Sequence, residues 1–256
     1  MNTRVKTAAE IESMRISGRM LATVLQQLKG QVTAGMSTKD IALISAAELQ
    51  ALGGKPAFLG YQGFPDVICI SVNEEVVHGI PTTGKIINQG DIVSLDFGVN
   101  YREMITDAAL SVIVGKPREQ RHADLVRATE ASMHAGIGVL RHKVRAGDIG
   151  AAVQQVLQNP KLGGPYGIVR DLVGHGVGHE LHEDPNVPNY GRPDTGPWFS
   201  AGMTICIEPM ATLGSERVYV ASDGWTIVTA DQSWAAHFEH TILITEDGAE
   251  ILTEVA

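Results

Sequence analysis

Residues 90–99 read GDIVSLDFGV, a run in which apolar side chains alternate with small or polar ones. This period of two predicts a β-strand, because successive side chains point to opposite faces of a sheet. Asp96 then lies in mid-strand, where aspartate is disfavoured. A second β-rich run spans residues 105–114, and a hairpin turn at residues 100–103 would place its Asp107 beside Asp96 on one face. Two such carboxylates repel unless a cation lies between them, so we expect a metal site or, alternatively, a solvent-facing pair on an edge strand.

Two glutamates and a cluster of histidines extend this pattern. Glu208 ends the apolar run 203–207, and Glu239 lies near the start of the run 238–244. Acidic residues are rarely buried unpaired, so a shared cation is the simplest explanation for four such carboxylates. Residues 174–183, GHGVGHELHE, contain three histidines. The segment HELH at 179–182 is one residue shorter than the H-E-x-x-H zinc motif, so it does not match that motif. We expect one of these histidines to ligate, and His179 to be a surface residue.

The ligand set indicates which metals fit. One imidazole with four carboxylates is rich in hard oxygen atoms and suits Mn(II), Fe(II) or Co(II) better than structural zinc. Four carboxylates also balance the charge of two divalent ions, which bridging ligands would hold roughly 3.5–4 Å apart. We therefore expect two divalent metal ions, Co, Mn or Fe, that activate a shared water.

Composition excludes several classes of protein. The chain has 256 residues, of which 44% are hydrophobic, and a net charge of -9. Generic nucleic-acid binding would need a basic surface, so we do not expect it. The sequence contains no run of 18 apolar residues, so we do not expect a membrane span. The two cysteines, Cys69 and Cys206, lack metal-ligand spacing and predict buried thiols in a cytoplasmic protein. We expect a single catalytic domain over residues 1–256.

The order of predicted elements repeats. A helix that starts at the capping box of residues 7–10, and a second that runs from residue 37 or 38 to Gly53, precede strands at 67–72, 92–99 and 105–114. A helix at about 119–142 and a shorter one capped by Asp148 precede strands at 203–210, 217–220, 225–228 and 237–245. The helix joints also share a Val-x-Ala-Gly pattern, at residues 32–35 and 144–147. The sequence thus predicts an α+β fold with two similar halves around one site.

Five segments resemble those of methionine aminopeptidases, over about residues 7–252. They are SVNEEVVHGIP at 71–81, the aspartates at 96 and 107, GHGVG at 174–178 with His182 and Glu183, IEPM at 207–210, and FEHT at 238–241. The resemblance implies the pita-bread (creatinase/aminopeptidase) fold, an antiparallel sheet backed by helices with internal pseudo-two-fold symmetry. The spacing between His182 and Glu208 leaves no room for the type II insertion, so the chain resembles the minimal bacterial type I form.

The resemblance also implies the role of each site residue. The implied metal ligands are Asp96, Asp107, His175, Glu208 and Glu239, with Asp107 and Glu239 bridging. The implied catalytic residues are His78, which contacts the substrate backbone, His182, which binds the scissile carbonyl oxygen, and Glu208, which shuttles a proton to the leaving amine. A methionine pocket would be lined by Phe58, Tyr61, Phe64, Cys69, Leu181 and Trp225. Three of these, Phe58, Phe64 and Leu181, stand where the family commonly has Cys, Tyr and Phe.

The function implied is removal of the N-terminal methionine from nascent polypeptides when the second residue is small, by a metal-activated hydroxide. The enzyme would be a monomer that works transiently near the ribosome. One alternative is a proline-directed aminopeptidase or dipeptidase of the same fold, which would keep the same ligands. Another is a catalytically inactive binding module, although all five ligand positions hold residues that can ligate.

Overall fold

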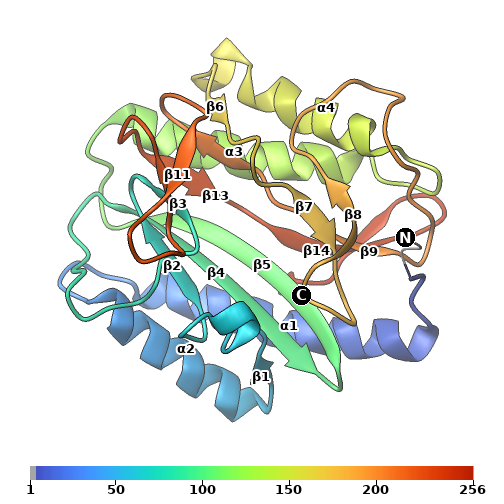
Figure 1. Ribbon diagram of the computed structural model, residues 1–256, viewed down its shortest axis with the longest axis horizontal. Coiled ribbons are helices and arrows are strands. Elements are labelled where there is room, and N and C mark those ends of the chain that lie inside the picture. The colour runs from blue at the N-terminus through green and yellow to red at the C-terminus, as the bar shows by residue number, and fades with distance from the viewer. Residues whose placement is uncertain (1–3, 256) are drawn as a thin grey trace.

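The computed structural model describes residues 4–255, whose elements follow one another in two similar groups (Figure 1). The first group contains α1 (Ala8–Gln31), α2 (Thr38–Leu52), β1 (Lys55–Pro56), the short 3-10 helix η1 (Tyr61–Gly63), β2 (Cys69–Val72), β3 (Glu75–Val77), β4 (Ile92–Tyr101) and β5 (Met104–Ile113). The second contains α3 (Gln120–Gly138), α4 (Ala146–Leu157), η2 (Pro160–Leu162), β6 (Gly167–Ile168), β7 (Gly174–Gly176), β8 (Glu183–Val187), β9 (Thr204–Ile207), β10 (Met210–Thr212), β11 (Val218–Val220), β12 (Ile227–Thr229), β13 (Ala235–His237), β14 (His240–Ile244) and β15 (Ala249–Ile251).

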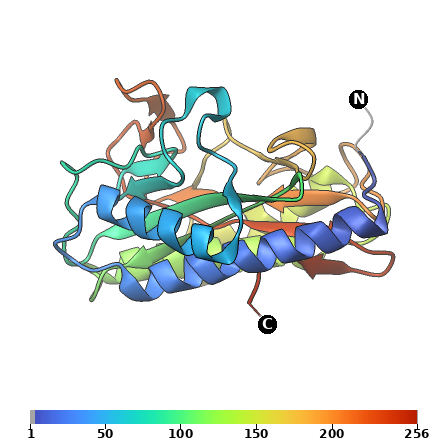
Figure 2. The same cartoon turned by 90° about the horizontal axis from the view of Figure 1, so that it is seen from below.

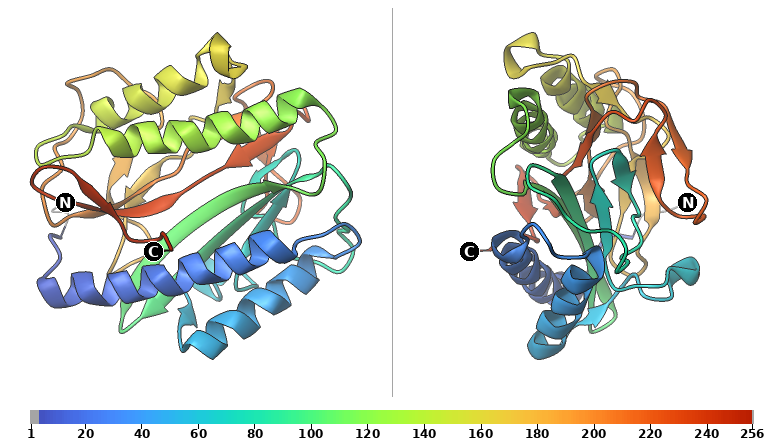
Figure 3. Two further views of the ribbon diagram at one scale, coloured as in Figure 1. Left: turned by 180° about the vertical axis from the view of Figure 1, so that it is seen from behind. Right: turned by 90° about the vertical axis from the view of Figure 1, so that its left-hand side faces the viewer.

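The strands form antiparallel sheets, and the four α-helices cover one side of them (Figure 3). In one sheet β4 pairs with β1, β2 and β5, and in the largest the order is β15-β14-β9-β7-β8. The loop with η1 and the hairpin of β11 and β12 lie on the opposite side from α1 and α2 (Figure 2). The prediction of an antiparallel α+β fold backed by helices is therefore confirmed, and one face of the sheets is left free of α-helices.

The helix starts show one confirmed prediction and one error. Thr7 caps α1, and its side chain and that of Glu10 form the expected capping box. Asp148, however, is not the N-cap of α4, because Arg145 holds that position. Asp148 lies in the first turn and its carboxylate accepts a hydrogen bond from the backbone N–H of Arg145 at 3.0 Å. An acidic residue at the third helical position satisfies the free N–H of the cap in this way.

The two halves do have similar structures, but the matching Val-x-Ala-Gly segments do not occupy equivalent positions in them. Ser37 caps α2 and Arg145 caps α4, each with an aspartate three residues later and each with an isolated β-bridge. In the matched Val-x-Ala-Gly segments, Val144 directly precedes its cap, whereas residues 33–36 separate Val32 from Ser37. The match therefore pairs positions that are not structurally equivalent.

Two predicted strands are each broken at the glutamate they contain. The run 203–210 divides into β9 and β10 at Glu208, and the run 237–245 divides into β13 and β14 at Glu239. Pro209 has no N–H with which to continue the ladder, which accounts for the first break. The four pieces still lie side by side, since β9 pairs with β14 and β10 with β13. Both carboxylates consequently sit at one interruption in the sheet.

Candidate active site

The two aspartates lie on one face of the β4–β5 hairpin, as predicted. Asp96 pairs with Ala109 and Asp107 pairs with Gly98, so the carboxylates are diagonal neighbours. Gly98 also makes room for the pocket, because a Cβ atom there would lie 2.6 Å from the ring of Phe58. The hairpin turn contains no glycine, and its two central residues, 102 and 103, adopt positive φ values of 51° and 64°.

Glu239 is the centre of the cluster of potential ligands. It belongs to three groups of side chains whose ligand atoms lie within 4.8 Å of one another, and one of these groups is Asp96, Asp107 and Glu239. The Nε2 atom of His175 lies 3.3 Å from Glu208 Oε1 and 3.9 Å from Glu239 Oε1. Backbone hydrogen bonds connect Glu239 with Ala109 of β5. These bonds join the interrupted part of the sheet to the β4–β5 hairpin that carries the two aspartates.

The electrostatics of this cluster favour a bound cation. Burial raises the pKa of Asp107 to about 7, and burial together with neighbouring carboxylates raises the pKa of Asp96, Glu208 and Glu239 well above its usual range. One oxygen each of Asp96, Asp107 and Glu239 is buried and has no hydrogen-bond partner among residues 4–255. Such orphaned acceptors are costly. The donor set therefore fits divalent metal ions, which would satisfy these oxygens and balance their charge.

His175 has the surroundings of a metal ligand. Its Nδ1 atom lies 2.9 Å from the carbonyl oxygen of Gly176, so Nδ1–H can donate there and leave Nε2 free to ligate. Burial, and then the nearby ring of His182, lowers the pKa of His175 to about 3, which keeps the imidazole neutral. Neutral imidazole is the ligating form.

These pKa shifts predict how pH affects stability. From about pH 7 upward, folded metal-free protein keeps protons on Asp96, Glu208 and Glu239, and in part on Asp107, that the unfolded chain has lost, because unfolded carboxyls titrate near pH 4. Its free energy of unfolding should therefore fall as pH rises. His78, His175 and His237 add little slope there, since their folded pKa values of about 3 to 4 and the unfolded value of about 6.5 both lie below this range. Melting temperatures of metal-free and metal-loaded protein test this. A metal-free melting temperature that rises above about pH 7 would contradict it.

Two further histidines, His78 and His182, line the same cavity. His78 follows β3 with a left-handed backbone (φ 60°), a strained conformation for a residue other than glycine. Burial, and then His182, lowers the pKa of His78 to about 4. The ring of His182 opens to the cavity, and the surrounding protein lowers its pKa as well. Both shifts favour the neutral imidazole, which can hydrogen-bond a substrate.

The apolar side chains predicted for a methionine pocket pack together. Phe58, Phe64, Cys69 and Leu181 are buried in one cluster, with Tyr61 and Trp225 against it. The ring of Phe64 makes edge-to-face contacts with Phe58 at 6.5 Å and with Trp225 at 5.2 Å between centroids. Contacts of this kind hold aromatic walls rigid.

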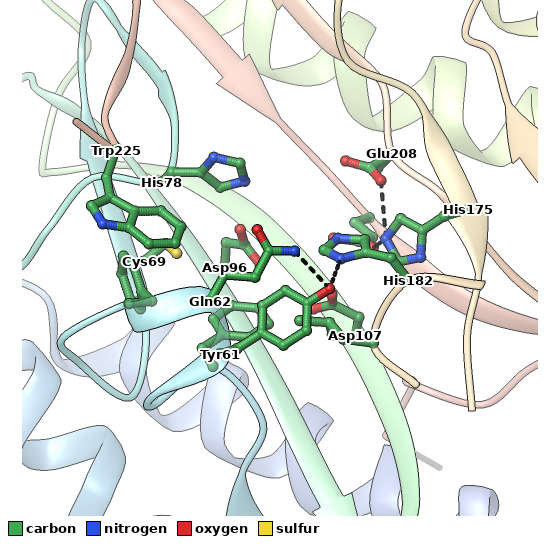
Figure 4. A pocket seen from close by; sticks show the side chains of 14 residues that line it. Tyr61, Gln62, Cys69, His78, Asp96, Asp107, His175, His182, Glu208 and Trp225 are labelled. Atoms are coloured by element: carbon green, nitrogen blue, oxygen red, sulfur yellow. Dashed lines mark hydrogen bonds and ion pairs between the residues drawn. The ribbon is translucent and has the colours of Figure 1, made fainter. Parts of the chain in front are cut away.

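One cavity of about 130 Å³ collects every residue that the sequence predicted for the site (Figure 4). The five potential metal ligands line one part and the apolar cluster lines another, with His78 and His182 also in its wall. A cavity of roughly 150 Å³ admits a benzene-sized group, so this volume suits one apolar side chain.

Sequence reasoning missed two neighbours of the site. Gln62 lines the cavity beside Tyr61, and its only signal was a polar residue within an aromatic segment. His237 is buried, and its Nε2 atom lies 3.8 Å from Glu208 Oε2 and 3.9 Å from Glu239 Oε2. Neither of its ring nitrogens has a hydrogen-bond partner among residues 4–255. Its position two residues before Glu239 was the available signal.

His179 is not a simple surface residue, so that prediction was wrong. The side chain is half-buried, and its Nε2 atom lies 2.7 Å from Glu10 Oε1 at the start of α1. Its backbone N–H donates to Glu183, whose carboxylate also binds the buried Nζ of Lys6 at 2.6 Å. His179 therefore anchors the loop that carries His182 to the N-terminal segment.

Comparison with known proteins agrees with this geometry. The sequence profile of Metallopeptidase family M24 matches residues 12–246. The chain is 41% identical over 250 residues to methionine aminopeptidase 1 of Bacillus subtilis and 39% identical over 250 residues to the methionine aminopeptidase of Mycoplasma capricolum, with 98% of each chain covered in both cases. The chain belongs to the methionine aminopeptidases of family M24. It is accordingly a metal-dependent hydrolase.

Solved structures give the same family and the expected fold. The methionine aminopeptidase of Thermotoga maritima superposes on this one with a TM-score of 0.95, at 45% identity, covering 99% of this chain and 100% of the other. The prolidase from Pyrococcus furiosus has a TM-score of 0.77 at 23% identity and is covered over only 66% of its length. That likeness shows the shared pita-bread fold alone, and the comparisons favour the methionine aminopeptidase over the proline-directed alternative. Within residues 4–255, no helix combines the length and apolar character needed to cross a membrane.

Proposed function

We propose that this chain removes the N-terminal methionine from nascent polypeptides whose second residue is small. The observation that carries the proposal is a single cavity in which five potential metal ligands, four of them buried, adjoin an apolar pocket. A peptide whose first side chain fills the pocket has its first peptide bond beside the ligand cluster. The curated relatives named methionine aminopeptidase support the same conclusion.

We assign the five ligands to two divalent ions. Asp107 and Glu239 would bridge the ions, and Asp96, His175 and Glu208 would complete the set. The shared position of Glu239 in the three ligand groups supports its bridging role. Metal ions held by such a set lower the pKa of water and polarise the scissile carbonyl group.

The remaining polar side chains would handle the substrate. His182 Nε2–H would donate to the scissile carbonyl oxygen and stabilise the charge that develops there. His78 would hydrogen-bond the substrate backbone near the scissile amide. Glu208 would carry a proton to the leaving amine. The openness of the His182 ring to the cavity and the neutral state of both histidines support these roles.

The apolar pocket would select methionine. An unbranched thioether packs well against aromatic rings and sulfur, here Phe58, Phe64, Trp225 and Cys69. Burying a methionine side chain contributes about 1.5–3 kcal/mol. Phe58 and Phe64 make the pocket more apolar than the Cys and Tyr common at these positions, so branched apolar side chains would be discriminated by shape alone.

Metal removal tests the proposal. Chelator-treated protein should release no methionine from Met-Ala-Ser, and Co(II), Mn(II) or Fe(II) should restore the activity, because no side chain in the cavity can replace the ions. Elemental analysis of the restored protein should give about two equivalents of metal per chain. Full activity in protein shown to be metal-free would refute the assignment.

The proposal places the enzyme in the cytoplasm as a single catalytic domain, residues 1–256, that acts as a monomer on chains close to the ribosome. Both cysteines are buried free thiols, which suits a reducing compartment. Its macromolecular partners would be the N-termini of new polypeptides.

A further inference from the structure

A chain of two hydrogen bonds leads from the surface to His182. The Nε2 atom of Gln62 lies 3.2 Å from Tyr61 Oη, and Tyr61 Oη lies 2.8 Å from His182 Nδ1. Figure 4 shows the three side chains in this order along the cavity wall. Gln62 and His182 are exposed, Tyr61 is half-buried, and all three line the cavity. The two hydrogen bonds therefore end on the imidazole proposed to bind the scissile carbonyl oxygen.

The donor and acceptor chemistry of the three side chains sets the direction of these hydrogen bonds, from Gln62 through Tyr61 to His182. An amide nitrogen only donates, so Gln62 occupies a lone pair of the Tyr61 oxygen and leaves the hydroxyl hydrogen free. Within residues 4–255 the Tyr61 hydroxyl has these two partners, and a hydroxyl that accepts from Gln62 is free to donate its hydrogen to His182 Nδ1. Neutral imidazole has one donor and one acceptor nitrogen. With Tyr61 as the donor, Nδ1 is the acceptor and the proton resides on Nε2.

We propose that Gln62 and Tyr61 are positioning residues that hold His182 in its Nε2–H tautomer. The inference rests on the proposed function, because that tautomer is the one that can donate to the scissile carbonyl oxygen. A donor already fixed toward the developing charge costs no reorganisation during the reaction. Tyr61 would thus act through His182 in addition to lining the methionine pocket.

The backbone and the neighbouring rings hold this arrangement in place. Gln62 adopts a left-handed conformation (φ 48°) between Gly60 and Gly63, which also have positive φ. Residues other than glycine keep such conformations only where the surrounding structure imposes them. The ring of His182 lies between Tyr61, at 5.4 Å, and His175, at 4.4 Å between centroids.

Reversing the direction of these hydrogen bonds would prevent His182 from donating to the carbonyl oxygen. If residue 62 could only accept, Tyr61 would donate to it and accept from His182 Nδ1–H. Nε2 would then carry a lone pair and could not donate to the carbonyl oxygen. Gln62→Glu makes this reversal with almost no change of shape. Gln62→Met removes the amide but leaves the Tyr61 hydroxyl free to donate, and Tyr61→Phe removes the hydroxyl but keeps the ring.

The test measures kcat and KM for Met-Ala-Ser with the metal-loaded enzyme. We expect the loss in kcat to grow in the order Gln62→Met, Tyr61→Phe, Gln62→Glu. Tyr61→Phe should lose about 10- to 100-fold, as is typical for the removal of an orienting partner. KM should change less than kcat, since the pocket keeps its rings. Gln232 donates to Tyr219 in a matching pair on the surface, so Gln232→Glu and Tyr219→Phe serve as controls that should retain wild-type kcat.

A spectroscopic readout separates positioning from a structural role. In Zn(II)-loaded protein, a diamagnetic form, ¹⁵N resonances of labelled histidine report which nitrogen carries the proton, and loss of a signal in His182→Asn assigns the residue. We expect Nε2–H in the wild type and Nδ1–H in Gln62→Glu, with equal metal content. Wild-type kcat in Gln62→Glu, or an Nδ1–H tautomer in the wild type, would overturn the inference. Absence of Met-Ala-Ser cleavage by the wild type would instead refute the proposed function.

Discussion

Replacing Glu239 by glutamine should nearly abolish turnover of Met-Ala-Ser. Glu239 is the member shared by all three groups of potential ligands, and its Oε1 atom is buried without a hydrogen-bond partner in the described part of the chain. Glutamine keeps the shape but removes one negative charge and one ligating oxygen. The loss in kcat should exceed the roughly 10- to 100-fold cost of losing an outer-shell partner, and bound metal should fall below two equivalents. Steady-state kinetics and elemental analysis on the same samples measure both.

Asp107→Asn should behave in the same way, because Asp107 is the second proposed bridge. Two control variants test whether the effect is specific to the proposed metal ligands. Glu216→Gln removes an exposed carboxylate that pairs with Arg170 at 3.1 Å, and should leave kcat and metal content unchanged. His179→Ala should retain most of the activity, since its partners are Glu10 and Glu183. If His179→Ala lowered the bound metal as much as Asp107→Asn, the ligand assignment would be wrong.

The second large effect concerns the second residue of the substrate. Rates should be high for Met before Ala, Gly, Ser or Thr and very low before Leu, Arg or Glu. The cavity continues into a wider groove, and the residues that line both are Tyr61, Gln62, His175 and His182. The ring of His182 contacts both Tyr61 and His175, so a larger second side chain must displace a packed wall. The strain is about 1–3 kcal/mol or more, and a misplaced scissile carbonyl lowers the rate further.

Tripeptides of the form Met-X-Ser measure this rule directly, with X varied and metal held constant. Because the wall includes Tyr61, the Tyr61→Phe variant should keep the same order of preference among X while its absolute rates fall. Comparable values of kcat/KM for Met-Ala-Ser and Met-Arg-Ser would refute steric exclusion as the basis of selection.

Sequence patterns predicted the aspartate pair well because a strand has a strict period. Once residues 90–99 were assigned to a strand, alternation and a short hairpin placed Asp96 and Asp107 on one face, as the register shows. The positions of Glu208 and Glu239 at an interruption could not be predicted in the same way. Both lie in continuous apolar runs, where the only signal of a break was Pro209.

Loops without periodicity limited the rest of the prediction. Residues 174–183 contain three histidines among glycines, and only the family resemblance selected His175 as a ligand. The network that joins His179 to Glu10 depends on contacts between segments far apart in sequence. Gln62 contacts Tyr61 because its backbone is left-handed, a conformation that the sequence does not predict. These features come from tertiary packing, which local propensity does not encode.

The most direct test of methionine removal at this site is product analysis of tripeptides varied at the first residue. Metal-loaded enzyme is incubated with Met-Ala-Ser, Leu-Ala-Ser and Ala-Pro-Ser, and the free amino acids released are quantified. We expect free methionine as the main product and slow release of leucine, since packing alone separates similar apolar side chains by only about 1–3 kcal/mol. We expect no cleavage of Ala-Pro-Ser. Faster release of leucine than of methionine, or preferred cleavage before proline, would contradict the account.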